Sequence, residues 1–170
     1  MLLGDSHLAR VRRDLSVLGP DVCNAAEGGA SSLDLIAQAT RAAVEEDDLV
    51  VVSVGTNDAA PWKHVPVTMF VRAMARCLQS VHARRWVYVA PPGVDESRLT
   101  GSGDRTNAVL DQYRDAAVSA CQVEGARVVR TERLIRGLGA AAFVSDGLHL
   151  SGRAYKVVLP AIADAIQATA

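Results

Sequence analysis

The sequence predicts an α/β domain of three layers, α/β/α, with a flavodoxin-like five-stranded parallel sheet in the order 2-1-3-4-5. Three observations support this fold class. Apolar runs and helical patterns alternate along the chain, and the strongest run, Leu49–Val54, is continuous and β-branched, as in a strand buried on both faces. Apolar residues make up 49% of the chain but aromatic residues only 4%, which suits helices packed on a parallel sheet. At 170 residues, we expect one domain over 1–170, without repeats or linkers.

Five apolar runs are the predicted strands of this sheet. The first is short, because only three residues precede Gly4. Since helices connect the strands, the crossovers should be right-handed and the strands parallel. The predicted strands are Met1–Leu3, Asp21–Asn24, Leu49–Val54, Trp86–Ala90 and Ala126–Arg130.

Helical patterns fill the segments between these strands. One begins near Ser31 and carries an apolar stripe of Leu33, Ile36, Ala37, Thr40 and Val44. The other predicted helices cover about Ser6–Leu18, Val67–Ala83, Thr106–Glu124 and Ser151–Gln167.

The longest irregular segment is the polar, Gly-rich loop Gly93–Arg105. It is either a lid or substrate-binding loop, or a solvated connection.

Charge and cysteine content limit the partners. A net charge of −1 gives no electrostatic reason to expect nucleic acid or an anionic membrane. The basic cluster Arg10, Arg12 and Arg13 is most simply one solvated helix face. Three cysteines at irregular spacing predict neither a disulfide framework nor a zinc site.

No segment is long and apolar enough to span a membrane, and no signal peptide precedes the first strand. We therefore expect a cytoplasmic location by default. An N-terminus that lacks a few residues would give the same start, so the true N-terminus stays open. The oligomeric state is not predicted.

Four short motifs follow predicted strands, in the order Gly4–His7, Gly28-Gly29, Gly55–Asp58 and Asp146–His149. In open parallel sheets, ligands bind beyond the carboxyl ends of the strands, at the switch point between strands 1 and 3. Ser6 follows the first strand and Asn57 the third. We therefore expect the motifs to meet at one edge of the sheet.

Ser6, His149 and Asp146 are the candidate catalytic residues. A serine hydroxyl needs an oriented base at neutral pH, and the spacing of Asp146 and His149 lets the carboxylate hold one ring nitrogen. Each residue alone also has a structural interpretation: Ser6 as a helix N-cap, His149 as a structural histidine and Asp146 as a cap.

Asn57 and Gly29 are candidate donors to an oxyanion, together with the backbone N–H of Ser6. Their alternative interpretation is ordinary turn chemistry. Trp62 either forms a wall of the acyl pocket or serves only in packing against other side chains. His7, His64 and His82 are interpreted as structural or surface groups.

The four motifs resemble those of the SGNH hydrolase superfamily, the GDSL-type esterases and lipases. Gly4-Asp5-Ser6 matches the first block, with His7 where leucine is common. Gly55–Asp58 matches the third and Asp146–Gly152 the last, whereas Asn24 and Gly29 match the second loosely. The resemblance implies Ser6 as nucleophile, His149 as base, Asp146 as its orienter, and an oxyanion hole of Ser6, Gly29 and Asn57. It also implies that no metal or organic cofactor is needed.

The predicted function is that of a serine esterase that hydrolyses short-acyl carboxylic esters through an acyl-enzyme. Its partner is then a small-molecule ester, either free or linked to a carbohydrate or lipid. Two alternatives stay open. One is an acyltransferase with a sugar or other alcohol as acceptor. SGNH domains linked to acyl transfer onto sugars also have a histidine after the nucleophile. The other is a catalytically silent ester- or glycan-binding domain.

Overall fold

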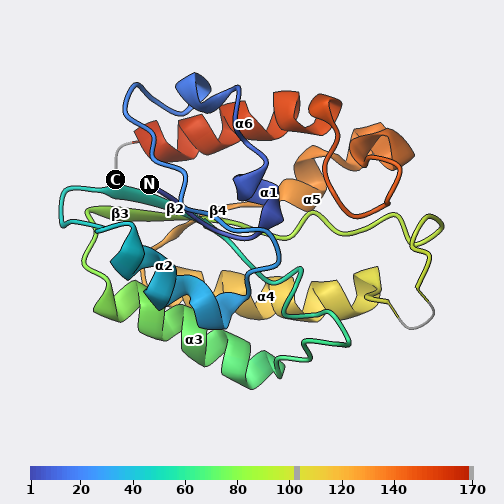
Figure 1. The fold of residues 1–170 in the computed structure, drawn as a ribbon, viewed down its shortest axis with the longest axis horizontal. Coiled ribbons are helices and arrows are strands. Elements are labelled where there is room, and N and C mark those ends of the chain that lie inside the picture. Colours follow the sequence, from blue (N-terminus) through green and yellow to red (C-terminus); the bar gives the residue numbers. More distant parts are fainter. Residues whose placement is uncertain (102–103, 169–170) are drawn as a thin grey trace.

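The computed structural model, which describes residues 1–101 and 104–168, has a parallel sheet between two layers of helices (Figure 1). Its four strands run in the order β1-β2-β3-β4. Gly4 of β1 pairs with Ser53 of β2, and Val51 of β2 pairs with Val87 of β3. The strands are β1 Leu2–Gly4, β2 Leu49–Ser53, β3 Arg85–Val89 and β4 Arg127–Val129.

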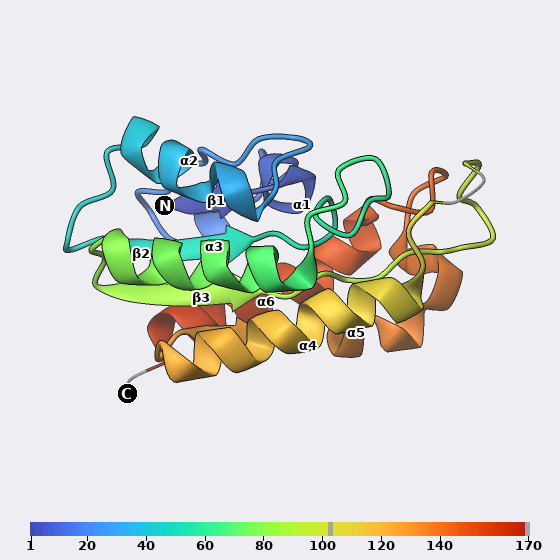
Figure 2. The ribbon, with the colours of Figure 1, turned by 90° about the horizontal axis from the view of Figure 1, so that it is seen from below.

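Alternating side chains of each strand build the two halves of the core. Leu3, Val50 and Val52 pack with the layer formed by α2, α3 and α4, whereas Leu2 and Val51 pack with α1 and α6 on the other face. Figure 2 shows α3 and α4 side by side on one face. The α-helices are α1 Ser6–Ala9, α2 Leu35–Arg41, α3 Val67–Ser80, α4 Asn107–Val123, α5 Thr131–Leu134 and α6 Gly152–Gln167. The 3-10 helices are η1 Leu15–Val17, η2 Ser32–Asp34 and η3 Arg136–Ala142. Within the two described ranges, no helix has the length and apolar character needed to cross a bilayer.

The predicted five-stranded sheet is wrong by one strand. The segment Asp21–Asn24 lies beside β1, as the order 2-1-3-4-5 requires, but it forms a single parallel bridge between Asn24 and Leu2. Two backbone hydrogen bonds form this bridge, from Leu2 N–H to the carbonyl of Cys23 at 2.8 Å and from Ala25 N–H to the carbonyl of Leu2 at 2.9 Å. The Asn24 side chain donates from Nδ2 to the carbonyls of Leu8 and Val11, at 2.9 and 3.0 Å. Asn24 thus pairs with β1 through its backbone and holds the end of α1 through its side chain.

The predicted first helix, Ser6–Leu18, is also too long. Helix α1 ends at Ala9, and the chain returns to helical geometry only in η1. Because the Asn24 amide satisfies two carbonyls that a longer helix would use, the turn stops there. Arg10, Arg12 and Arg13 therefore follow the helix and do not form one of its faces.

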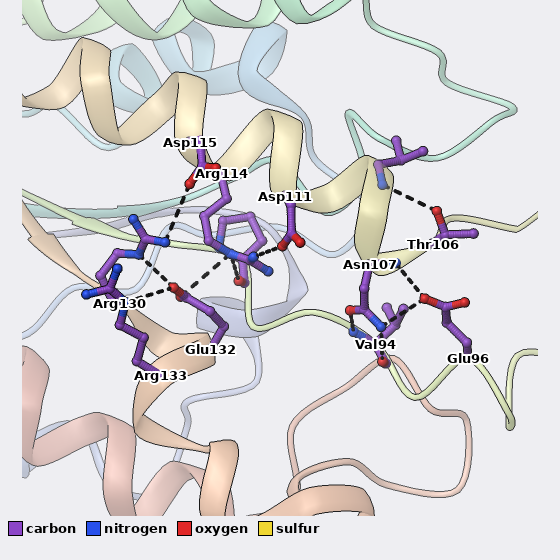
Figure 3. A network of polar contacts seen from close by, with 12 residues as sticks. Val94, Glu96, Thr106, Asn107, Asp111, Arg114, Asp115, Arg130, Glu132 and Arg133 are labelled. Atoms are coloured by element: carbon purple, nitrogen blue, oxygen red, sulfur yellow. Dashed lines mark hydrogen bonds and ion pairs between the residues drawn. The ribbon is translucent and has the colours of Figure 1, made fainter.

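An ionic network fixes the carboxyl end of β3 (Figure 3). Arg114 of α4 donates from Nε to the carbonyl of Pro91 at 2.9 Å, and Nε also lies 3.6 Å from Glu132 of α5. Asn107 exchanges two hydrogen bonds of 2.9 Å with the backbone of Val94. The start of the loop Gly93–Arg105 is therefore anchored to α4.

Candidate active site

Ser6 is the first residue of α1, directly beyond the carboxyl end of β1. Asp5 is the N-cap: its Oδ1 accepts from the backbone N–H of His7 at 2.9 Å, and its own N–H donates to Ser53 at 2.8 Å. Burial raises the pKa of Asp5 to about 7, against the hydrogen bond from His7, which lowers it. Asp5 therefore shapes the turn that presents Ser6.

Gly4 allows this turn to form against β2. Its φ is +113°, and a Cβ there would lie 2.0 Å from the carbonyl oxygen of Ser53. Gln38 of α2, whose side chain is buried, binds Gly4 through two hydrogen bonds. It accepts from Gly4 N–H at 2.6 Å and donates to the Gly4 carbonyl at 3.0 Å. Sequence reasoning missed Gln38, because a polar residue within a helix gives no signal that it is buried.

His149 lies between Ser6 and Asp146. Its Nε2 is 3.0 Å from Ser6 Oγ, and its Nδ1 is 2.7 Å from Asp146 Oδ2. The other carboxylate oxygen of Asp146 accepts from the N–H groups of Leu148 and His149, both at 2.9 Å. The structure thus brings the three predicted catalytic residues together, although 143 positions separate Ser6 from His149.

The same contacts keep Asp146 ionised. Its partial burial acts to raise the pKa, but hydrogen bonds from the backbone and ring of His149 and from Leu148 N–H outweigh it and lower the pKa to about 2. A charged carboxylate therefore faces Nδ1 of His149 over the whole range near neutrality. This arrangement favours the tautomer that leaves Nε2 as the acceptor toward Ser6.

Asn57 and Gly29 line the same groove as Ser6. Asn57 Nδ2 donates to the carbonyl of Ala30 at 2.9 Å, which uses one of the two N–H groups of the amide. Gly29 has a φ of +81°, and Lys63 Nζ binds its carbonyl. Among the described residues, the N–H groups of Gly29 and Ser6 have no acceptor.

Asp58 links the loops that carry these donors. Its Oδ1 accepts from the backbone and hydroxyl of Ser32, at 2.9 and 2.6 Å, and its Oδ2 from Gly55 N–H at 3.0 Å. Burial raises the pKa of Asp58 despite these hydrogen bonds, which lower it. One buried carboxyl group therefore joins the third motif to Ser32, three residues after the second motif.

A groove of about 450 Å³ is lined by four of the predicted site residues, Ser6, Gly29, Asn57 and His149. Trp62, predicted as a possible wall, lines it and is 67% exposed. Arg105 stacks on the Trp62 ring with its Cζ 4.8 Å from the centroid, and its Nη1 donates to the carbonyl of Thr56 at 3.1 Å. Sequence reasoning did not single out Arg105.

A larger cavity, of about 520 Å³, lies elsewhere, between α4, α5 and η3. Arg114 and Glu132 of the network in Figure 3 line it, and none of the predicted site residues does. The groove at Ser6 is therefore the candidate active site. Within residues 1–101 and 104–168, no three His, Cys, Asp or Glu side chains gather as metal ligands would.

His7 differs from the other two histidines that were interpreted as structural or surface groups. His64 and His82 are exposed, whereas His7 is 3% exposed and its ring centroid lies 6.1 Å from that of His149. Burial, together with the nearby His149, Arg10 and Arg105, lowers the pKa of His7 to about 3. The ring is therefore neutral and serves as packing beneath the site.

A parallel α/β/α fold that gathers residues of all four motifs around one groove defines an SGNH-type hydrolase. The model of the GDSL-like lipase/acylhydrolase family matches residues 3–157, so this chain belongs to that family. A GDSL esterase/lipase of Arabidopsis thaliana is 32% identical over an alignment of 136 residues, and the match covers 68% of this chain and 53% of the relative. The chain thus spans about half the length of that curated relative.

Solved structures share the fold. A lipase/acylhydrolase from Enterococcus faecalis has a TM-score of 0.82 at 21% identity, over 97% of this chain and 93% of that one. An acetylxylan esterase from Geobacillus stearothermophilus has a TM-score of 0.77 at 17% identity, over 99% and 93%. At these identities the likeness concerns the fold alone.

Proposed function

We propose that this chain is a serine ester hydrolase in which residues 1–170 form one SGNH domain, with Ser6 as the nucleophile. The observation that carries the proposal is the chain of contacts from Ser6 Oγ to His149 Nε2, 3.0 Å, and from His149 Nδ1 to Asp146, 2.7 Å. Family membership supports ester chemistry, and the short Ser6–His149 distance favours an active enzyme over a silent binding domain.

In the first step, Ser6 Oγ attacks the ester carbonyl while His149 Nε2 accepts its proton. Asp146 stabilises the imidazolium that forms. The N–H groups of Ser6 and Gly29 and the free N–H of Asn57 would bind the oxyanion. His149 then returns the proton to the leaving alcohol, and the acyl-enzyme remains.

In the second step, His149 takes a proton from water, the hydroxide oxygen attacks the acyl carbon, and Ser6 leaves with the proton from His149. The product is a free carboxylic acid. An acyltransferase would use an alcohol in place of water with the same residues.

We propose a short acyl group for this reaction. The groove is a modest cavity of about 450 Å³ with glycine, arginine and histidine among its walls, which suits a small acyl group better than a long lipid chain. One relative in fold is an acetylxylan esterase, a protein whose name indicates an acetyl ester.

Hydrolysis of p-nitrophenyl esters of increasing acyl length tests the proposal. We expect wild type to favour acetate or butyrate, and Ser6→Ala to lose about 10⁴-fold or more in kcat with an unchanged melting temperature. Comparable turnover by folded Ser6→Ala would exclude Ser6 as the nucleophile. Added alcohol acceptors separate the alternatives: ester product outpacing free acid would indicate a transferase.

A further inference from the structure

Positively charged side chains gather around the proposed nucleophile. Arg10, Arg12 and Arg105 line the same groove as Ser6 and His149. Among the described residues that line it, none is an aspartate or a glutamate. The chain as a whole has a net charge of −1, so this local excess does not follow from general basicity.

Arg10 and Arg12 have their guanidinium groups available. Both are exposed, and within the described part of the chain neither side chain forms an ion pair or a hydrogen bond. Three carboxylates in this part of the molecule have partners other than Arg10 and Arg12. Glu27 pairs with Arg41 at 2.5 Å, Asp104 with Arg105 at 3.0 Å, and Asp146 with His149 at 2.7 Å.

Arg105 has a different role in the same groove. Its side chain is 2% exposed, and its ion pair with Asp104 offsets its charge. Stacked on Trp62, it forms a fixed wall. The uncompensated charge of the groove therefore comes from Arg10 and Arg12.

The end of α1 at Ala9 is what places these two arginines. Beyond Ala9 the backbone leaves the helix, so Arg10 and Arg12 line the groove while Arg13, equally exposed, does not. The interpretation of the three as one solvated helix face is thus wrong. Arg13 provides a matched control for the other two.

We propose that the groove selects esters that carry a negative charge away from the reacting carbonyl, with Arg10 and Arg12 as the residues that determine this specificity. Guanidinium groups bind carboxylate and phosphate through paired hydrogen bonds, and a concave surface of one sign concentrates ligands of the opposite sign. The proposal rests on the esterase function proposed above and names its substrate class.

Two matched ester pairs test it, one for each side of the ester. For the alcohol side, 4-acetoxybenzoate is compared with its methyl ester; for the acyl side, 4-nitrophenyl hemisuccinate is compared with its methyl ester. The readout is the ratio of kcat/KM for the charged over the neutral member at low salt. We expect a ratio on the order of ten in one pair, since each exposed ion pair contributes up to about fivefold and two arginines act together.

That ratio should fall to near one in the Arg10→Ala/Arg12→Ala double variant and in about 1 M NaCl, where the screening length is about 3 Å. Arg13→Ala should keep it. Ratios near one in both pairs for wild type, with the neutral esters turned over, would overturn the charge proposal and leave the esterase function standing.

Ligand binding to the Ser6→Ala variant distinguishes failure of the charge proposal from failure of the proposed esterase function. Titration calorimetry with 4-acetoxybenzoate and with 4-nitrophenyl hemisuccinate at low salt should detect binding of at least one that the added Arg10→Ala/Arg12→Ala changes weaken on the order of tenfold. If no ester were hydrolysed, the proposed function would fail, while this titration would still decide the charge proposal. Equal binding with and without the two arginines would overturn it.

Discussion

At Asn57, one N–H of the side-chain amide is directed by the carbonyl of Ala30, which fixes the orientation of the other. If that second N–H stabilises the oxyanion, Asn57→Ala should lower kcat by about 10²–10³-fold and leave KM within a few-fold, because the contact strengthens only as charge develops. Steady-state kinetics on p-nitrophenyl acetate measure both values.

The melting temperature of Asn57→Ala provides the control, since the loss of one partly buried hydrogen bond should cost only about 0.5–1.5 kcal/mol. An unchanged kcat in a folded variant would remove Asn57 from the proposed oxyanion hole.

Residues within the four motifs could be placed from the sequence, because their order along the chain and the rule for parallel sheets put them at one edge. Ser6, Asn57 and His149 do lie around one groove. Gln38 and Arg105 could not be found this way. Each acts through a partner distant in sequence, Gly4 for Gln38 and Thr56 for Arg105, and no local pattern encodes such pairs.

The segment that carries Asp146 and His149 is held by the loop Gly93–Arg105. Asp95 N–H donates to the carbonyl of Gly147 at 2.7 Å, and Gly147 has a φ of +69°. A Cβ on Gly147 would lie 2.6 Å from the carbonyl oxygen of Asp95 and 2.8 Å from Cβ of Arg98. In this structure the loop therefore supports the segment that carries the proposed catalytic pair.

Gly147→Ala should displace that segment. We expect an unfolding free energy lower by at least about 1–2 kcal/mol from the left-handed backbone alone, and a fall in kcat/KM, because small misplacements of catalytic groups are costly. Urea unfolding and ester kinetics check both.

Gly137→Ala in η3 is the matched control. A Cβ there meets no atom within 4 Å, so stability and kcat/KM should change little. If the two variants behaved alike, close packing at Gly147 would not be what positions Asp146 and His149.

At the level of elements, long periodic patterns were predicted better than short ones. Helices α3, α4 and α6 lie close to their predicted ranges, whereas α1 ends where the Asn24 side chain binds its last carbonyls and the second strand is reduced to one bridge. The stripe predicted for the second helix is out of phase, since Leu33 is exposed and Leu35 and Gln38 are buried. Helices α5 and η3 were not predicted, because short helical turns carry little periodicity.

For the molecule as a whole, two buried groups beside Ser6 couple stability to pH in opposite directions. The pKa of His7 falls from 6.5 to about 3 on folding, so its contribution to stability is lost as pH falls through that range. The pKa of Asp5 rises from 3.8 to about 7, so its contribution is lost as pH rises. Between about pH 4 and 6.5 the two slopes nearly cancel.

His7→Leu should expose this balance. Relative to wild type, the variant should gain up to about 1.4 kcal/mol in unfolding free energy for each pH unit below about 6.5, since only the unfolded wild type takes up the proton. Denaturant unfolding at several pH values gives the difference. A difference that stayed constant from pH 7 to pH 4 would contradict a buried, neutral His7.

The central claim is that Ser6 is a nucleophile activated by His149, and covalent trapping tests it most directly. After reaction with a fluorophosphonate, peptide mass mapping should place the label on Met1–Arg10, in which Ser6 is the only serine. Ser6→Ala should take up no label there, and His149→Ala should react far more slowly. A label on another residue, or ester turnover that persists without labelling of Ser6, would contradict the account.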